Sequence, residues 1–276
     1  WIVGFLQAHN LSFSERGMVR HMGDILGNGA ALSPRHLSEY LDAIFHARRW
    51  DWMDPSKDVK ADADALVQFM TPIAKALLTD RGFDATVMAQ QLYGGNGYCV
   101  EWGAEQYVRD ARIAMIYEGT NGIQAWDLAN RKLKMNGGQH WQMLLNDIEQ
   151  FAEGLDGELQ ETGQQLGLAT AACRSTAEHF LERHSEGKSR DVAAGSVTFQ
   201  RLLSETVGAW LLARGAKSAA ARIANGDSDR DYLRTKITIA RFFAGQFLPA
   251  SIASAQSACA GDELLFADDE DMLSSF

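Results

Sequence analysis

The sequence has few of the residues that build disulfide-rich, metal-binding or membrane-spanning proteins. Its 3 cysteines, Cys99, Cys173 and Cys259, are odd in number and far apart. No Cys-x-x-Cys pair occurs, so neither a structural zinc site nor a disulfide framework is indicated. A reducing, cytoplasmic compartment is the simplest interpretation. No apolar run approaches the length of a bilayer span, and the first residues lack the pattern of a secretory signal.

Proline and positive charge are also scarce. Only 4 of 276 residues are proline, while Ala and Leu recur throughout, a composition that favours helices. The formal net charge of -10 argues against nonspecific nucleic-acid binding, which needs a basic surface. It leaves room for an anionic ligand, because the local field at a site can oppose the global charge. The chain is long enough for one or two domains, each with a core.

Apolar residues at helical spacing, and no strand-like alternation of useful length, predict an all-α protein. The first 50 residues match no pattern we recognise, apart from an apolar helical stripe over 37–45. A longer stripe runs from Ala63 through Leu78 to Leu92, where glycine ends it. Pro72 interrupts this stripe, so it either kinks the helix or begins a new helix capped by Thr71.

The second half of the chain reads as a helical bundle. We expect a short helix over 102–109 and a longer one from about 120 to Gly137-Gly138, the strongest boundary in the chain. Four amphipathic segments follow, at about 141–155, 164–184, 197–225 and 229–257. Four helices with short connections indicate an antiparallel bundle. The acidic run 268–271 reads as a solvated tail.

Three short motifs occur in order within some thirty residues: Gly94-Gly95-Asn96-Gly97-Tyr98, Arg109-Asp110-Ala111-Arg112 and Tyr117-Glu118-Gly119-Thr120. The glycine turn alone is most often a helix C-cap, and it lacks the context of a Rossmann or P-loop motif. The arginines and aspartate most often tie down a loop by charge-assisted hydrogen bonds.

Glu118 is the candidate catalytic residue. A lone glutamate at this position is ordinarily a solvent-facing acid favoured by a helix N-terminus. A catalytic base needs freedom to reach its substrate and partial desolvation. Bulky Ile116 and Tyr117 before Glu118, and bare Gly119 after it, would supply both.

From Thr71 to Leu133 the chain resembles the C-terminal helical domain of the flavin-dependent acyl-CoA dehydrogenases, on these three motifs in this order. By this resemblance Glu118 is the catalytic base and Gly119 lies beside the acyl group. The cofactor-binding residues that it implies are Gln91, Tyr93, Gly94, Gly95, Thr120 and Asn121. Many members carry Gln or Glu where this chain has Gly122, which puts one polar contact to the cofactor in doubt.

The resemblance also implies the chemistry. Glu118 would remove the α-proton of an acyl-CoA thioester while the β-hydrogen leaves as hydride to FAD, giving the 2-enoyl-CoA. Hydrogen bonds to the thioester oxygen, including one from the backbone N–H of the base, would stabilise the developing charge. An electron-transfer flavoprotein would accept the electrons, as in fatty acid β-oxidation. A homo-oligomer is expected, because flavin contacts in this family cross between subunits.

The resemblance divides the chain into an unassigned helical segment 1–50, a dehydrogenase C-terminal domain 51–136 and a helical extension 139–276. Tyr232, Lys236 and the stretch 240–249 are similar to the C-terminal extension of a larger subgroup. The family's N-terminal helical domain and middle β-domain have no recognisable counterpart, so we expect a fragment of the full enzyme. The alternative is a helical assembly module, derived from this family, that no longer catalyses.

Overall fold

In the computed structural model, residues 57–266 are described, and every regular element among them is a helix. The predicted all-α fold is therefore confirmed for this part of the chain. The expected helix over 37–45 and the acidic run 268–271 lie outside the described residues. The described chain forms two compact units, one containing 57–63 and 74–121, the other 64–73 and 122–266. The three predicted domain boundaries stay predictions.

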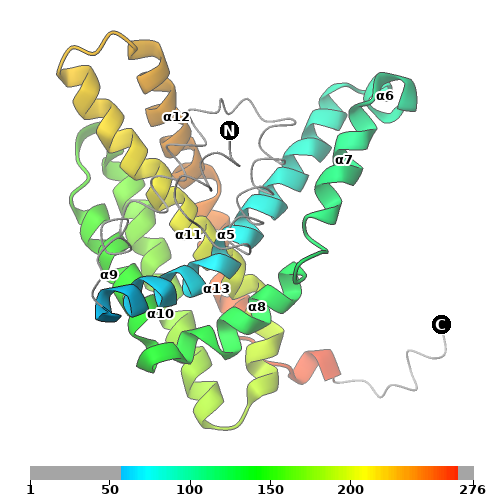
Figure 1. Ribbon diagram of the computed structural model, residues 1–276, viewed down its shortest axis with the longest axis vertical. Helices are drawn as coiled ribbons and strands as arrows, with labels where there is room; N and C mark the ends of the chain where they lie inside the picture. Colours follow the sequence, from blue (N-terminus) through cyan, green and yellow to red (C-terminus); the bar gives the residue numbers. More distant parts are fainter. Residues whose placement is uncertain (1–56, 267–276) are drawn as a thin grey trace. The chain divides into compact units, whose positions relative to one another are not determined.

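The first unit is a helical hairpin. Helix α5 (Lys57–Leu92) is followed by the short α6 (Gly95–Tyr98), the 3₁₀ turn η1 (Val100–Trp102) and α7 (Ala104–Ile113). Figure 1 shows α5 and α7 side by side, with α6 at the chain reversal. The reversal depends on Gly97, where an added Cβ would lie 2.3 Å from the Gln90 carbonyl oxygen. The predicted short helix exists, displaced by a few residues from 102–109.

Helix α8 (Asn121–Asn130) begins where the sequence predicted, but it does not run on to Gly137-Gly138. The 3₁₀ segment η2 (Lys132–Gly138) follows it and leaves helical geometry at Met135. Asn136 and Gly137 then adopt left-handed backbone, with φ of 50° and 67°. The prediction of one continuous helix to Gly137-Gly138 is wrong: α8 ends at Asn130, and the left-handed Asn136 and Gly137 then interrupt the 3₁₀ segment that follows it.

The second unit is a bundle of α9 (Gln139–Glu153), α10 (Gln160–Ser185), α11 (Ser189–Ala224), α12 (Arg230–Gln246) and α13 (Leu248–Ala258), with short 3₁₀ turns η3 (Gly157–Leu159) and η4 (Glu263–Phe266). The first two predicted segments are confirmed to within a few residues, and the third exists but begins at Ser189, eight residues before the predicted 197. The fourth, 229–257, is two helices that meet at Phe247. Pro249 sits in the first turn of α13, where its missing N–H does no harm, whereas inside a continuous helix it would remove a hydrogen bond.

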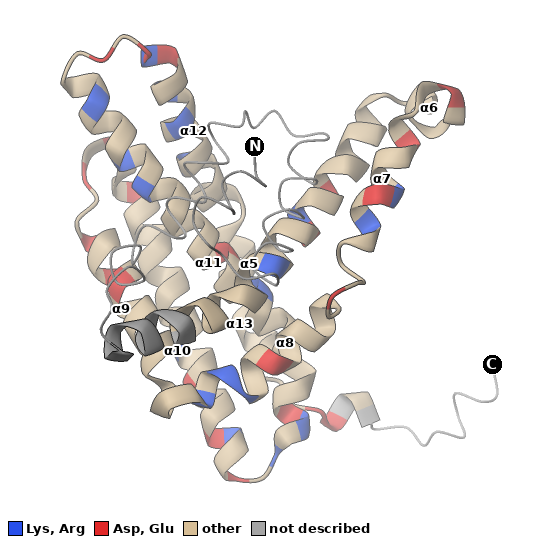
Figure 2. Cartoon of the chain, in the orientation of Figure 1, with Lys and Arg blue, Asp and Glu red and all other residues tan. Residues whose placement is uncertain are grey.

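Helix α11 is the central helix of the bundle. Nine consecutive residues, 202–210, are buried, so this stretch is covered on every side and not along one stripe. Figure 1 shows α10, α11 and α12 running alongside one another. In Figure 2, basic and acidic residues alternate along the described helices. No described helix is long and apolar enough to cross a membrane.

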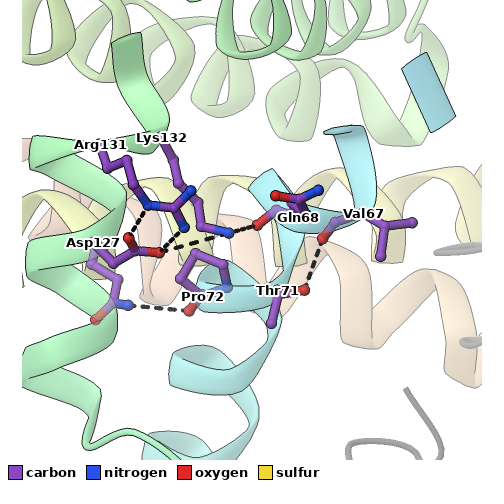
Figure 3. A network of polar contacts seen from close by, with 8 residues as sticks. Val67, Gln68, Thr71, Pro72, Asp127, Arg131 and Lys132 are labelled. Carbon is purple, nitrogen blue, oxygen red and sulfur yellow. Dashed lines mark hydrogen bonds and ion pairs between the residues drawn. The ribbon is translucent and has the colours of Figure 1, made fainter. Parts of the chain in front are cut away.

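Pro72 does not end α5, because side chains of the second unit bind the backbone around it (Figure 3). A proline has no N–H for the carbonyl four residues earlier, here that of Gln68. The ammonium of Lys132, a buried residue, donates to that carbonyl instead and lies 3.7 Å from Asp127. Gln200 donates to the Pro72 carbonyl at 3.1 Å.

The expected cap at Thr71 is therefore wrong. The Thr71 hydroxyl donates to the Val67 carbonyl at 2.8 Å, the bond of a threonine inside a helix. Of the two alternatives at Pro72, the new helix is wrong, because α5 continues through it, and the kink stays a prediction. The partners that keep α5 continuous lie far along the chain.

Candidate active site

Glu118 lies in the seven-residue loop that joins α7 to α8. It is one of two non-glycine residues with positive φ in the described chain, at 53°, and Gly119 follows at 85°. The amide of Tyr117 donates to the Ile113 carbonyl at 3.1 Å, and the amide of Asn121 closes the loop on the Met115 carbonyl at 3.1 Å. A left-handed glutamate is uncommon and persists where the surroundings fix it.

The Glu118 side chain is exposed, and neither its carboxylate nor its backbone N–H bonds to any described residue. The expected apolar wall does not cover it, since Ile116 is 49% exposed and Tyr117 is 36% exposed. The described residues alone therefore do not supply the desolvation that the sequence suggested. What they supply is an accessible carboxylate and an accessible N–H donor on the same residue.

A polar network anchors the C-terminal side of this loop to α5. The Lys75 ammonium donates to the Gly119 carbonyl at 2.7 Å and to the side-chain oxygen of Asn121 at 2.6 Å. The Asn121 amide group in turn donates to Asp80 at 2.6 Å and to the Thr79 hydroxyl at 2.9 Å. Three α5 residues within two turns, Lys75, Thr79 and Asp80, thus bond to Asn121 at the start of α8.

Opposing effects act on the pKa of Lys75. Burial lowers the pKa of its ammonium, while the negative charges of Asp80 and then Glu118 raise it. Opposite charges nearby favour the protonated form, and burial disfavours it. The Lys75–Glu118 attraction acts at longer range than an ion pair, because the Lys75 ammonium and the Glu118 carboxylate do not come within 4.0 Å of each other.

The remaining predicted cofactor residues lie at the opposite end of the hairpin. Gln91, Tyr93, Gly94 and Gly95 are exposed near the reversal, and a Cβ at either glycine would meet nothing within 4 Å. Leu92 lies about 25 Å along α5 from Lys75, at roughly 1.5 Å of rise per residue. One chain therefore brings Thr120 and Asn121 close to Glu118 but does not bring Gln91–Gly95 there.

The second motif contacts the following loop through Arg112 alone, and not through Arg109 and Asp110 as the sequence suggested. Arg109 and Asp110 lie within α7, are exposed and bond to no described residue. Only Arg112 makes contacts, stacking 5.3 Å over the Phe83 ring and donating to the Met115 sulfur at 3.4 Å. The motif lies within α7 because this helix runs to Ile113 and not to 109 as expected.

The sequence reasoning missed Lys75. The sequence analysis interpreted this helix only by its apolar positions, so it did not single out Lys75. The available signal was a single cation within the apolar stretch Ile73, Ala74, Ala76 and Leu77. A charge at such a position is retained only with partners, so it indicates a partner elsewhere in the chain.

Comparison with known proteins agrees with the geometry. Residues 57–133 match the model of the acyl-CoA dehydrogenase C-terminal domain, and 144–268 match the acetyl-CoA dehydrogenase C-terminal-like model. The 3-methylmercaptopropionyl-CoA dehydrogenase of Ruegeria pomeroyi is 34% identical over 231 residues, which cover 78% of this chain and 38% of that protein. A broad-specificity linear acyl-CoA dehydrogenase of Mycobacterium tuberculosis is 30% identical over 190 residues, 65% of this chain and 31% of that protein.

Among solved structures, an acyl-CoA dehydrogenase complexed with FAD from Bacillus anthracis matches 94% of this chain and 50% of its own with a TM-score of 0.59. At 14% identity this likeness shows the fold alone. The chain belongs to the acyl-CoA dehydrogenase family and comprises its C-terminal helical domain and the C-terminal-like extension. It spans about a third of the length of these curated relatives.

Proposed function

We propose that this chain carries the catalytic base of an FAD-dependent acyl-CoA dehydrogenase, and that the base is Glu118. One observation carries the proposal: an accessible carboxylate and an accessible backbone N–H belong to the same residue, in a loop fixed by the Lys75–Asn121 network. The substrate is an acyl-CoA thioester, the class that both named relatives act on.

The residues of this loop have separate roles in the reaction. The Glu118 carboxylate takes the proton from the carbon next to the thioester carbonyl. The Glu118 N–H donates to the thioester oxygen, where negative charge develops as that proton leaves. Gly119, which has no side chain, leaves room for the acyl group beside the base.

The exposed residues fit a flavin nucleotide that is bound partly by another subunit. Gly94 and Gly95 offer open backbone, and Gln91 offers an amide, but these groups lie too far from Glu118 to serve the same site in one chain. They would hold the cofactor of a neighbouring subunit, while Thr120 and Asn121 would contact the cofactor near their own Glu118. When bound, FAD accepts the hydride from the β-carbon. A homo-oligomer follows from this division.

Two further assignments belong to the proposal. An electron-transfer flavoprotein takes the electrons onward, in fatty acid β-oxidation or a similar reaction sequence in the cytoplasm. The parts of a dehydrogenase that hold the flavin ring come from outside the described helices, so activity requires the complete protein.

The test is to replace Glu118 with Gln in the complete protein, and to mix it with acyl-CoA while recording flavin absorbance. Loss of a general base lowers the rate by about 10²- to 10⁴-fold, so flavin bleaching should nearly stop while FAD stays bound. Glu101→Gln, at another exposed glutamate of the same unit, is the matched control and should bleach normally. Normal bleaching by Glu118→Gln refutes the assignment.

The exposure of many large apolar side chains in the first unit favours a second candidate, a noncatalytic assembly module. Leu92 is 88% exposed, Tyr98 is 80% exposed and Trp102 is 67% exposed. Such surface is typical of a face that packs against another subunit. Purifying the complete protein and recording its visible spectrum separates the two, since tight stoichiometric flavin contradicts the module.

A further inference from the structure

The loop that presents Glu118 has an unusual backbone for its sequence. Two consecutive residues, Glu118 and Gly119, have left-handed φ, and only the second is a glycine. For a glutamate this conformation is strained, and it is kept only when the surrounding structure determines it. The hydrogen bonds at Tyr117 and Asn121 close the loop at its two sides but do not touch the peptide group between Gly119 and Thr120.

Lys75 bonds to that peptide group. Its ammonium holds the Gly119 carbonyl at 2.7 Å and the Asn121 side chain at 2.6 Å, so it links the loop to the first residue of α8. Asn121 is itself held by Asp80 and Thr79, whose backbones belong to the same rigid helix as Lys75. The peptide group between Gly119 and Thr120 is thereby held in a fixed orientation relative to α5.

The charges around Lys75 fit this role. Asp80 lies on the same helix and Glu118 in the loop, and both favour the ammonium that burial disfavours. Because Lys75 does not pair with Glu118, it attracts the loop without occupying the carboxylate. A direct ion pair between Lys75 and Glu118 would engage the carboxylate that the substrate needs.

We propose that Lys75 is the positioning residue of the Glu118 loop: by binding the Gly119 carbonyl and Asn121, it keeps Glu118 in the left-handed conformation that presents its carboxylate and N–H together. This inference rests on the proposed function of Glu118, but its structural part does not. A displacement of about 1 Å at a catalytic group lowers rates up to about 10²-fold, so loss of this anchor affects turnover more than substrate binding.

The test uses Lys75→Met in the complete protein. Hydrogen exchange of the peptide covering 113–121 should accelerate about tenfold or more, because the loop then opens locally. Flavin reduction at saturating acyl-CoA should slow by about 10- to 100-fold with KM changed less than about threefold. Lys132→Met is the matched control, since it also removes a largely buried ammonium that binds a backbone carbonyl but does not bond to the loop. It should lower the global stability of the protein but leave the local opening of 113–121 and the rate of flavin reduction near those of the unaltered protein.

Unchanged exchange in Lys75→Met overturns the inference, as does equal acceleration in the Lys132→Met control. If Lys75→Met does not fold, Asn121→Ala decides in its place, because it removes the second acceptor and the link to Asp80 while keeping Lys75. The exchange measurement needs no turnover. It therefore decides the role of Lys75 even if Glu118→Gln bleaches flavin normally and the proposed function fails.

Discussion

The contact between Lys132 and the backbone at Pro72 gives a prediction that can be worked out in free energy. Removing the ammonium by Lys132→Met leaves the Gln68 carbonyl without a donor, because Pro72 has no N–H to offer. A hydrogen bond to a charged group contributes about 1.5–3 kcal/mol. Burial lowers the pKa of Lys132, so part of this is offset when the buried charge disappears. We expect a net loss of about 1–2 kcal/mol in the free energy of unfolding.

The reasoning is tested by a double-mutant cycle with Pro72→Ala. An alanine at position 72 supplies the N–H that the Gln68 carbonyl lacks, so Lys132→Met no longer leaves this acceptor bare. The cost of Lys132→Met should then fall by about 1 kcal/mol, which is the coupling energy of the cycle. Urea unfolding of the four proteins, followed by far-UV circular dichroism, measures it. Costs that are additive to within about 0.3 kcal/mol would contradict the account.

Two further predictions concern the bundle. Gly195→Ala places a Cβ 1.9 Å from the Ala258 carbonyl oxygen and 2.8 Å from the Phe180 ring, so it should destabilise the protein by about 3 kcal/mol or more. At Gly215, on the same helix, an added Cβ meets nothing within 4 Å, so Gly215→Ala should instead stabilise the protein by about 0.5–1 kcal/mol. The denaturant midpoints of the two variants are compared. Equal midpoints would contradict the close packing at Gly195. Burial raises the pKa of Cys173 to about 12, so a thiol reagent should modify exposed Cys99 quickly and Cys173 only on unfolding. Because Cys259 is partly exposed, a fast phase that survives Cys99→Ser combined with Cys259→Ser would contradict this.

Three helix ends could be predicted from the sequence because a glycine follows an apolar stripe, although the same reasoning failed at Gly137-Gly138. Gly94, Gly187 and Gly226 all have left-handed φ and all follow a helix that the periodicity indicated. Proline was less informative, because its effect depends on partners distant in the chain. Pro72 is accommodated by Lys132, which lies 64 residues after the carbonyl that it binds, while Pro249 begins a helix that was predicted to be continuous.

The candidate base could be predicted from its motif, but its anchoring could not. Nothing in the order Tyr117-Glu118-Gly119 requires that the glutamate itself adopt positive φ, because the adjacent glycine could have taken up the turn alone. The network that fixes this backbone joins residues more than 40 positions apart, from Lys75 to Asn121. The spacing of residues within a short motif does not predict contacts between distant parts of the chain. For the same reason it did not decide whether Glu118 is exposed or covered.

The most direct test of the central claim follows the α-proton itself. The complete protein is incubated with an acyl-CoA in D₂O, and deuterium at the carbon next to the thioester carbonyl is measured by NMR. We predict that the unaltered protein and Glu101→Gln incorporate deuterium at this carbon and that Glu118→Gln does not. Incorporation by Glu118→Gln at the unaltered rate would show that another group removes the proton.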